Sequence, residues 1–188
     1  MSSQALPQAI LLDRDGVINF DSPDYILAPE QWHAIPGSLE AIAKLTQAGI
    51  AIAIVSNQSA VGRGMVDDKT FDAIHQKMMQ AIKDAGGKIE HIAYCPHAPD
   101  AQCLCRKPLP GMLLESLQVL SCKPESALMI GDSFRDVQAA HAAGVPAMLV
   151  QSGYGDAAQI LEKSRALSPH ILAFPDLATA TTHILEVS

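Results

Sequence analysis

Short apolar runs recur along the chain, separated by segments whose apolar residues repeat every three or four positions. An apolar run of strand length without polar alternation is typical of a parallel strand that is buried on both faces. We therefore expect strands at 9–12, 50–55, 89–94, 127–130 and 147–150, and a weaker one near 170–173.

The segments between these runs carry signals for helix starts and helix ends. Gly37-Ser38 is expected to cap a helix over 39–48, which Gly49 should terminate. A longer helix should start at Asp67 or Asp68 and end before Gly86-Gly87. Further helices are expected at 111–120, 134–143, 156–166 and from 176 onward.

This alternation of strands and helices indicates an α/β fold, with a doubly wound (Rossmann-like) parallel sheet and helices on both faces. The length of 188 residues fits one domain, which we expect to span 1–188. Ligands of such sheets bind at the carboxyl ends of the strands. The residues that follow each strand are therefore the candidates for chemistry.

Composition excludes several classes of protein. Hydrophobic residues make up 48% and charged residues 18% of the chain, so its body is not intrinsically disordered. A net charge of -7 argues against broad nucleic-acid binding. Residues 1–8 do not resemble a signal sequence, and the longest apolar run, 49–55, is far shorter than the ~20 residues of a membrane span. We expect a cytoplasmic monomer without nucleic-acid or membrane partners.

Two carboxylates follow the first predicted strand. Asp13 and Asp15 are spaced so that both could reach one ion, such as Mg²⁺, or one phosphoryl group. Asp13 could then attack phosphorus, while Asp15 could act as general acid and base. Taken alone, this D-x-D motif is also common in ordinary turns.

Two further strand ends add polar groups. Ser56 ends the second strand, where a hydroxyl and backbone N–H groups can cradle a phosphate, although alone an ordinary polar loop is the better interpretation. Asp132 follows Gly131, which permits close backbone approach, and is expected beside Asp13 as a metal ligand. Asp136 could orient a lysine or the metal shell. A helix N-terminus also favours Asp, but three such strand ends together favour a site.

Four metal-binding side chains lie within eleven residues. They are Cys95, His97, Cys103 and Cys105. This C-x-H…C-x-C array fits a closed, structural Cys₃His zinc site, whereas a redox pair would more usually read C-x-x-C. The ion should hold a loop that presents Arg106 and Lys107 to the substrate. Cys122 is expected to be buried or incidental.

The motifs resemble those of the haloacid dehalogenase superfamily of phosphohydrolases. In chain order they are Asp13-x-Asp15-Gly16, Ser56-Asn57-Gln58, Lys107-Pro108 and Gly131-Asp132-x-x-x-Asp136. The Cys/His loop is similar to that of the subgroup with heptose bisphosphate and histidinol-phosphate phosphatases. Segments 57–59, 63–64 and 107–113 are more like the heptose enzymes. The resemblance covers about 10–150 and implies a minimal cap.

What the resemblance implies is a phosphatase that takes the 7-phosphate from a small-molecule heptose bisphosphate, through an aspartyl-phosphate, in making activated heptose for lipopolysaccharide or surface glycans. Asp13 would be the nucleophile and Asp15 the acid/base, while Ser56 and Lys107 would hold the transferring phosphoryl group. Mg²⁺ would bind the Asp13 carboxylate, the Asp15 carbonyl and Asp132. Arg106 would recognise the distal phosphate. The substrate-lining set is Asp21, Ser22, Pro23, Asp24, Asn57, Gln58, Ser59, Arg63, Arg106 and Ser133.

Two features separate this chain from many heptose members. Ser133 stands where lysine is common, and only five residues separate His97 from Cys103, as in histidinol-phosphate relatives. A histidinol-phosphate or other small sugar-phosphate phosphatase is therefore an alternative. A phospho-acceptor receiver domain is an alternative of a different class, although it would need neither Asp15 nor the Cys/His loop.

Overall fold

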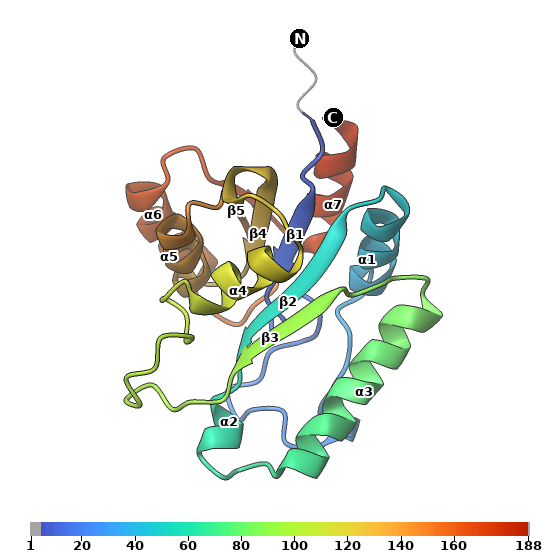
Figure 1. Cartoon of the computed structure of the whole chain (residues 1–188), viewed down its shortest axis with the longest axis vertical. Coiled ribbons are helices and arrows are strands. Elements are labelled where there is room, and N and C mark those ends of the chain that lie inside the picture. Colours follow the sequence, from blue (N-terminus) through green and yellow to red (C-terminus); the bar gives the residue numbers. More distant parts are fainter. Residues whose placement is uncertain (1–4, 188) are drawn as a thin grey trace.

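The computed structural model describes residues 5–187, so residues 1–4 of the segment considered as a signal sequence lie outside the described part. Six strands form one sheet, in the order β3-β2-β1-β4-β5-β6 (Figure 1). They are β1 (Ala9–Leu12), β2 (Ala51–Asn57), β3 (His91–Cys95), β4 (Ala127–Gly131), β5 (Ala147–Val150) and β6 (Leu172–Phe174). Every neighbouring pair is parallel, which confirms the predicted sheet.

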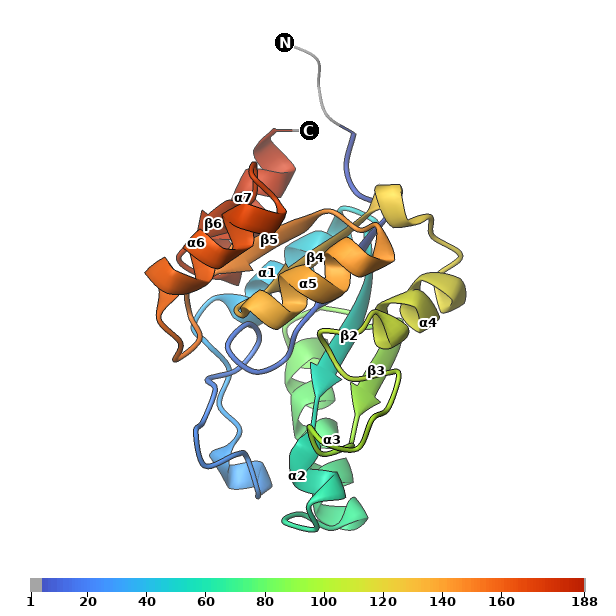
Figure 2. The same cartoon turned by 90° about the vertical axis from the view of Figure 1, so that its left-hand side faces the viewer.

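Helices cover both faces of this sheet. They are α1 (Ser38–Gln47), α2 (Ser59–Gly62), α3 (Asp68–Asp84), α4 (Gly111–Val119), α5 (Phe134–Ala143), α6 (Ala157–Leu167) and α7 (Leu177–Glu186). One core joins the sheet to α1, α3 and α7, while α4, α5 and α6 pack on the other face. In Figure 2, α4 and α5 lie in front of the sheet, with α1 and α3 behind it.

Strand β1 explains why the predicted strands carry almost no polar residues. Ile10 and Leu12 belong to the core under α1 and α3, whereas Ala9 and Leu11 belong to the core under α4 and α5. Because successive side chains of a strand point to opposite faces, a strand between two helical layers must be apolar at every position.

The chain changes direction across the sheet at β1. It runs from β1 to β2 and β3, and then returns to β4 on the other side of β1. Such a switch point leaves a crevice above the carboxyl ends of the strands. Figure 1 shows α2 and the loop after β3 at this lower end of the molecule, while β1 begins and α7 ends at the opposite end.

Capping of α3 and α5 agrees with the sequence, whereas that of α1 does not. Asp67 accepts a hydrogen bond from the Thr70 N–H at 2.7 Å, and Gly144 ends α5 with a positive φ. Gly37 is the N-cap of α1 but supplies no side-chain bond. Ser38 lies inside the helix, and its hydroxyl donates to the Ile18 carbonyl at 2.6 Å. Ser38 thus ties the loop after β1 to α1 instead of capping the helix.

Helix α2 was not expected, because four residues are too short to produce a helical repeat of apolar positions. The two long connections at the crevice are 13–37, which contains the 3₁₀ turn η1 (Pro29–Gln31), and 96–110. A second 3₁₀ turn, η2 (Pro124–Ser126), precedes β4. Within residues 5–187, none of the helices is both long and apolar enough to cross a membrane.

Candidate active site

Three carboxylates meet at the carboxyl ends of β1 and β4. Asp13, Asp132 and Asp136 each place a carboxylate oxygen within 4.8 Å of the others. Asp13 follows β1, and its N–H still bonds the Ile130 carbonyl of β4 at 3.0 Å. A Cβ atom at Gly131 would overlap the Asp136 side chain, so only glycine lets the first turn of α5 approach this closely.

Lys107 is buried between two of these carboxylates, with 2% of its surface exposed. Its Nζ lies 2.8 Å from Asp13 Oδ2 and 2.6 Å from Asp136 Oδ1, and it donates to the Val55 carbonyl at 2.8 Å. These contacts use all three ammonium hydrogens. Burial lowers the pKa of Lys107, but the charges of Asp13 and Asp136 outweigh it and raise the pKa above its ordinary value. Lys107 is therefore a fixed positive charge beside Asp13.

The carboxylates differ in how readily they ionise. Burial, opposed by the Lys107 charge, raises the pKa of Asp13 to about 7. Burial and the Asp136 charge raise the pKa of Asp132 to about 8. Burial also acts on Asp136, but the Lys107 charge and its hydrogen bonds hold that pKa below its ordinary range. One lysine among three close carboxylates leaves excess negative charge, and hard oxygen donors of this kind fit Mg²⁺.

The Asp15 carboxylate is not part of this group of three. Its Oδ1 accepts from Arg14 Nε at 3.1 Å, Arg14 Nη2 at 2.9 Å and Asn19 Nδ2 at 2.8 Å, and its Oδ2 accepts from Arg14 Nη2 at 2.9 Å. Although burial raises the pKa of Asp15, the Arg14 charge and these hydrogen bonds lower it overall. Arg14 thus pairs with the Asp15 carboxylate, whereas the Asp13 carboxylate lies with those of Asp132 and Asp136.

The segment after β2 connects the separate parts of the site. Gln58 donates through Nε2 to Asp15 Oδ2 and to Ser56 Oγ, both at 2.8 Å. Asn57 holds the backbone of Lys107: its Nδ2 donates to the Lys107 carbonyl and its Oδ1 accepts from the Lys107 N–H, both at 3.0 Å. These two amides, expected to line the sugar, are thus bonded to other residues of the site.

All these groups line one cleft of about 440 Å³. The sequence-predicted residues along it are Asp13, Asp15, Asp21, Ser22, Pro23, Ser56, Asn57, Gln58, Ser59, Arg106, Lys107, Asp132, Ser133 and Asp136. Asp24 and Arg63 are exposed and do not line it. Arg63 follows the last residue of α2, beyond the part of that helix that borders the cleft.

Sequence reasoning missed other residues along the cleft. They are Arg14, Tyr25, Ile26, Ala60, Phe134, Arg135, Tyr154, Gly155 and Ile160. Tyr154 and Gly155 come from the loop after β5, where the Ser152 hydroxyl donates to the Gly16 carbonyl at 2.7 Å. A Cβ at Gly153 would overlap the Asp132 carboxylate. Arg14, Phe134 and Arg135 had a sequence signal, because they are the unspecified positions of the motifs Asp13-x-Asp15 and Asp132-x-x-x-Asp136.

The predicted Cys/His cluster is assembled beside the cleft. Cys95, His97, Cys103 and Cys105 each bring a ligand atom within 4.8 Å of the others. Cys95 Sγ lies 3.6 Å from Cys103 Sγ and 3.5 Å from His97 Nδ1, which lies 3.3 Å from Cys105 Sγ. Tetrahedral zinc bonds of ~2.3 Å to sulfur and ~2.0 Å to nitrogen require separations of about 3.5–3.8 Å. The cluster could therefore hold a metal ion.

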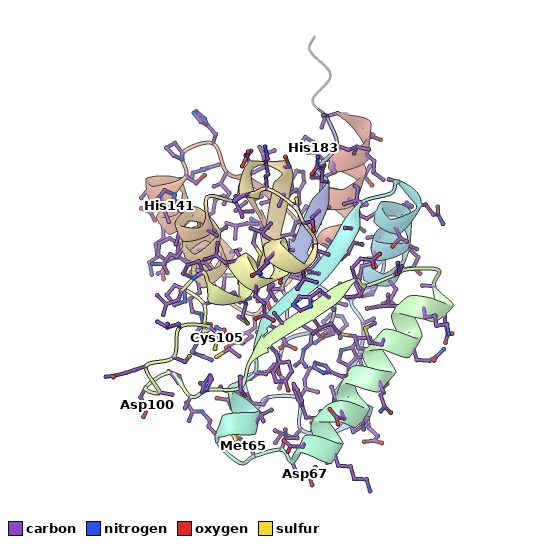
Figure 3. The ribbon with its side chains drawn as sticks, viewed as in Figure 1. Met65, Asp67, Asp100, Cys105, His141 and His183 are labelled. Atoms are coloured by element: carbon purple, nitrogen blue, oxygen red, sulfur yellow. The ribbon has the colours of Figure 1, made fainter. Side chains whose placement is uncertain are left out.

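Figure 3 shows Cys105 on the segment after β3 that also carries Asp100, far from His183 on α7. Arg106 follows this cluster directly, and its Nη1 donates to the His97 carbonyl at 3.3 Å. The metal-binding loop and the guanidinium that borders the cleft are thus linked. Cys122 lies apart from the cluster, half-buried, with its thiol 3.4 Å from the Lys123 carbonyl.

Comparisons with known proteins match this chain to phosphatases. A family profile described as HAD-hydrolase-like matches residues 104–180. The chain is 42% identical to the D-glycero-beta-D-manno-heptose-1,7-bisphosphate 7-phosphatase of Pseudomonas putida, over 94% of this chain and 98% of that protein. It is 47% identical to the enzyme of the same name from Bordetella bronchiseptica, over 78% of this chain and 82% of that protein.

Solved structures agree with these matches. A crystal structure of D,D-heptose 1,7-bisphosphate phosphatase from B. bronchiseptica, complexed with magnesium and phosphate, superposes with a TM-score of 0.90. It shares 41% identity and covers 96% of this chain and 99% of its own. The enzyme of that name from Burkholderia thailandensis has a TM-score of 0.69 and 31% identity over 95% and 98% of the two chains. The chain belongs to the haloacid dehalogenase-like family of D-glycero-β-D-manno-heptose-1,7-bisphosphate 7-phosphatases.

Proposed function

We propose that this enzyme hydrolyses the 7-phosphate of D-glycero-β-D-manno-heptose 1,7-bisphosphate through a phosphate ester of Asp13. The observation that carries the proposal is the Asp13 carboxylate, held 2.8 Å from the buried Lys107 ammonium at the floor of the cleft. The near full-length similarity to phosphatases of that name supports the choice of substrate over histidinol phosphate.

In the first half of the reaction, a carboxylate oxygen of Asp13 forms a bond to phosphorus while the bond from phosphorus to the sugar oxygen breaks. The Arg14 N–H donates to Asp13 Oδ1 at 2.7 Å and Lys107 contacts Oδ2, so the nucleophile cannot rotate freely. Asp15 gives its proton to the leaving sugar oxygen. Because its pKa is lowered, Asp15 does not hold this proton beforehand: it relays a proton from the substrate's phosphate, whose second pKa is near ~6, to the sugar oxygen as the bond to phosphorus breaks.

In the second half, Asp15 takes a proton from water, whose oxygen attacks phosphorus and releases Asp13. The lowered pKa of Asp15 suits this step, because the carboxylate is ionised at neutral pH. Gln58 links Asp15 to Ser56, so the acid/base group and the hydroxyl for the phosphoryl group keep a fixed separation. Positioning and charge compensation supply most of the catalysis in such a reaction.

Magnesium would be held by the carboxylates of Asp13 and Asp132, together with the Asp15 backbone carbonyl. When bound, Mg²⁺ supplies positive charge that offsets the negative charge of the phosphoryl oxygens. Asp136 already pairs with Lys107 and accepts the Ser133 hydroxyl at 2.6 Å, so we assign it to orienting the lysine.

A substrate panel tests the proposed function directly. With Mg²⁺ present, kcat/KM for the heptose bisphosphate should exceed that for histidinol phosphate and fructose 1,6-bisphosphate by at least about tenfold, or ~1.4 kcal/mol. Phosphate release is the measurement. A preference for histidinol phosphate would refute the assignment of substrate while leaving the phosphatase chemistry intact.

We also propose that the Cys/His cluster holds one structural zinc ion. All four positions are filled by protein, so no open position remains for substrate. Metal analysis should find one zinc per chain in the natural protein and none in Cys103→Ser. Because the metal contributes to folding, the Tm of Cys103→Ser should fall by about 5–10 °C.

Cys122→Ser is the matched control for this prediction, because Cys122 lies outside the cluster. It should keep both its zinc and its Tm. A chelator that removes magnesium should stop turnover reversibly while zinc stays bound. Protein purified without chelators and free of zinc would contradict the proposal.

Arg106 is proposed to bind the phosphate that is not removed. Arg106→Ala deletes a charge-assisted contact worth ~1.5–3 kcal/mol, so kcat/KM for the bisphosphate should fall about 10- to 100-fold. The loss for heptose 7-phosphate, which lacks the distal group, should be much smaller. Arg63→Ala is the control, because Arg63 lies outside the cleft. If Arg106→Ala lowered kcat/KM by the same factor for both substrates, this assignment would be ruled out.

A further inference from the structure

Arg135 is a cation of the cleft that the fold leaves without a bonded partner. Its exposed side chain lines the cleft from the first turn of α5. Within the described part of the chain its guanidinium makes no hydrogen bond or ion pair. By contrast, Arg14 is paired with Asp15, and Lys107 with Asp13 and Asp136.

Helix stability does not account for a cation at this position. The N-terminus of a helix carries partial positive charge, which disfavours a guanidinium in the first turn. The α5 N-terminus is already capped, because the Ser133 N–H and hydroxyl both donate to Asp136 Oδ2. Arg135 therefore contributes nothing to the start of α5 that the capping box does not supply.

The charges along the cleft indicate what Arg135 is for. Five carboxylates line it: Asp13, Asp15, Asp21, Asp132 and Asp136. A phosphate ester carries a charge of about -1.5 to -2 at pH 7, so a bisphosphate brings up to about four further negative charges. The buried Lys107 serves the transferred phosphate. Of the cations that line the cleft, only Arg106 and Arg135 have no carboxylate partner.

The segments that carry these two arginines lie on opposite sides of β1 in the sheet. Arg106 follows β3, which lies beyond β2 on one side of β1, whereas Arg135 follows β4 on the other side. Asp21, from the loop after β1, also lines the cleft and interacts electrostatically with Arg135. Burial and the Asp15 charge raise its pKa to about 6, and Arg14 and Arg135 partly oppose that rise. Arg135 is exposed where Lys107 is buried, so its guanidinium is available to a part of the substrate other than the transferred phosphoryl group.

We propose that Arg135 is a second binding residue for the retained phosphate of the bisphosphate, in addition to Arg106. This inference rests on the proposed function, since only a substrate with a second phosphate gives Arg135 a partner. A guanidinium suits this task because it binds phosphate in a bidentate manner without needing to be buried.

The test compares two substrates. kcat/KM is measured for the heptose bisphosphate and for p-nitrophenyl phosphate, which has no second phosphate, in the natural enzyme, Arg135→Gln and Arg135→Lys. In Arg135→Gln the ratio of kcat/KM for the bisphosphate to kcat/KM for p-nitrophenyl phosphate should fall about tenfold or more. Arg135→Lys keeps the charge and should recover part of the ratio. Arg165→Gln, an exposed arginine of α6, is the matched control and should keep the natural ratio.

A binding measurement separates recognition from turnover. In an Asp13→Asn background, which cannot form the phosphoenzyme, calorimetry should show bisphosphate binding weakened about tenfold by Arg135→Gln. If the natural enzyme does not prefer the bisphosphate, the proposed substrate and this inference both fail. If the natural enzyme does prefer the bisphosphate, but Arg135→Gln lowers kcat/KM equally for both substrates or for neither, only the inference about Arg135 is wrong.

Discussion

Asp13→Asn should abolish phosphate release from every substrate while leaving the protein folded. A neutral amide cannot attack phosphorus, so the first bond of the reaction cannot form. The expected result is a kcat below about one thousandth of the natural value, since the bond between Asp13 and phosphorus is the first step of the reaction. Phosphate release with purified protein measures it, and a residual rate of more than a few per cent would exclude the aspartyl-phosphate mechanism.

Stability should not fall with this substitution. In the metal-free protein, burial raises the pKa of Asp13 to about 7, above its value of 3.8 in an unfolded chain. Between these two pH values the Asp13 carboxyl binds more protons in the folded state than in the unfolded chain. The free energy of unfolding therefore declines as the pH rises from the lower value to the higher one. The replacement amide carries no such charge, so the Tm of Asp13→Asn at about pH 7.5 should equal or exceed the natural one. Asp24→Asn, which alters an exposed carboxylate outside the cleft, is the control for activity.

Much of the fold follows from the apolar runs, because burial on both faces leaves a strand no polar positions. The β1 and β5 bounds agree with the sequence prediction, and the others differ by a few residues. The meeting of Asp13, Asp132 and Asp136 also follows, since neighbouring parallel strands end at the same edge of the sheet.

The remaining parts of the site depend on contacts that have no local signature. The sequence indicates only that Tyr154 follows a strand, whereas the loop after β5 is brought to the cleft by Ser152 and by the absence of a side chain at Gly153. Likewise, the sequence places Asn57 and Gln58 near the site but does not say that their amides bind Lys107 and Asp15. Short-range sequence patterns predict which residues lie near the site, whereas the hydrogen-bond partners of their side chains depend on tertiary packing.

Lys107→Met should remove both activity and stability. Its ammonium holds Asp13 and Asp136 and carries the positive charge beside the reacting phosphoryl group. Losing such a preorganised charge costs roughly 10²–10³ in kcat. Removing one member of a buried ion pair leaves its partners uncompensated, so the free energy of unfolding should fall by about 3–5 kcal/mol. Denaturant unfolding and phosphate release measure the two effects.

A second substitution separates the two roles of Lys107. In Lys107→Met/Asp136→Asn, the buried Asp136 no longer carries a charge without a partner, so much of the lost unfolding free energy should return. Activity should stay as low as in the single variant, because the Lys107 ammonium beside Asp13 is still missing. If the double variant regained activity together with stability, Lys107 would act only through folding. If neither returned, the Asp136 pair would not be what stabilises this part of the site.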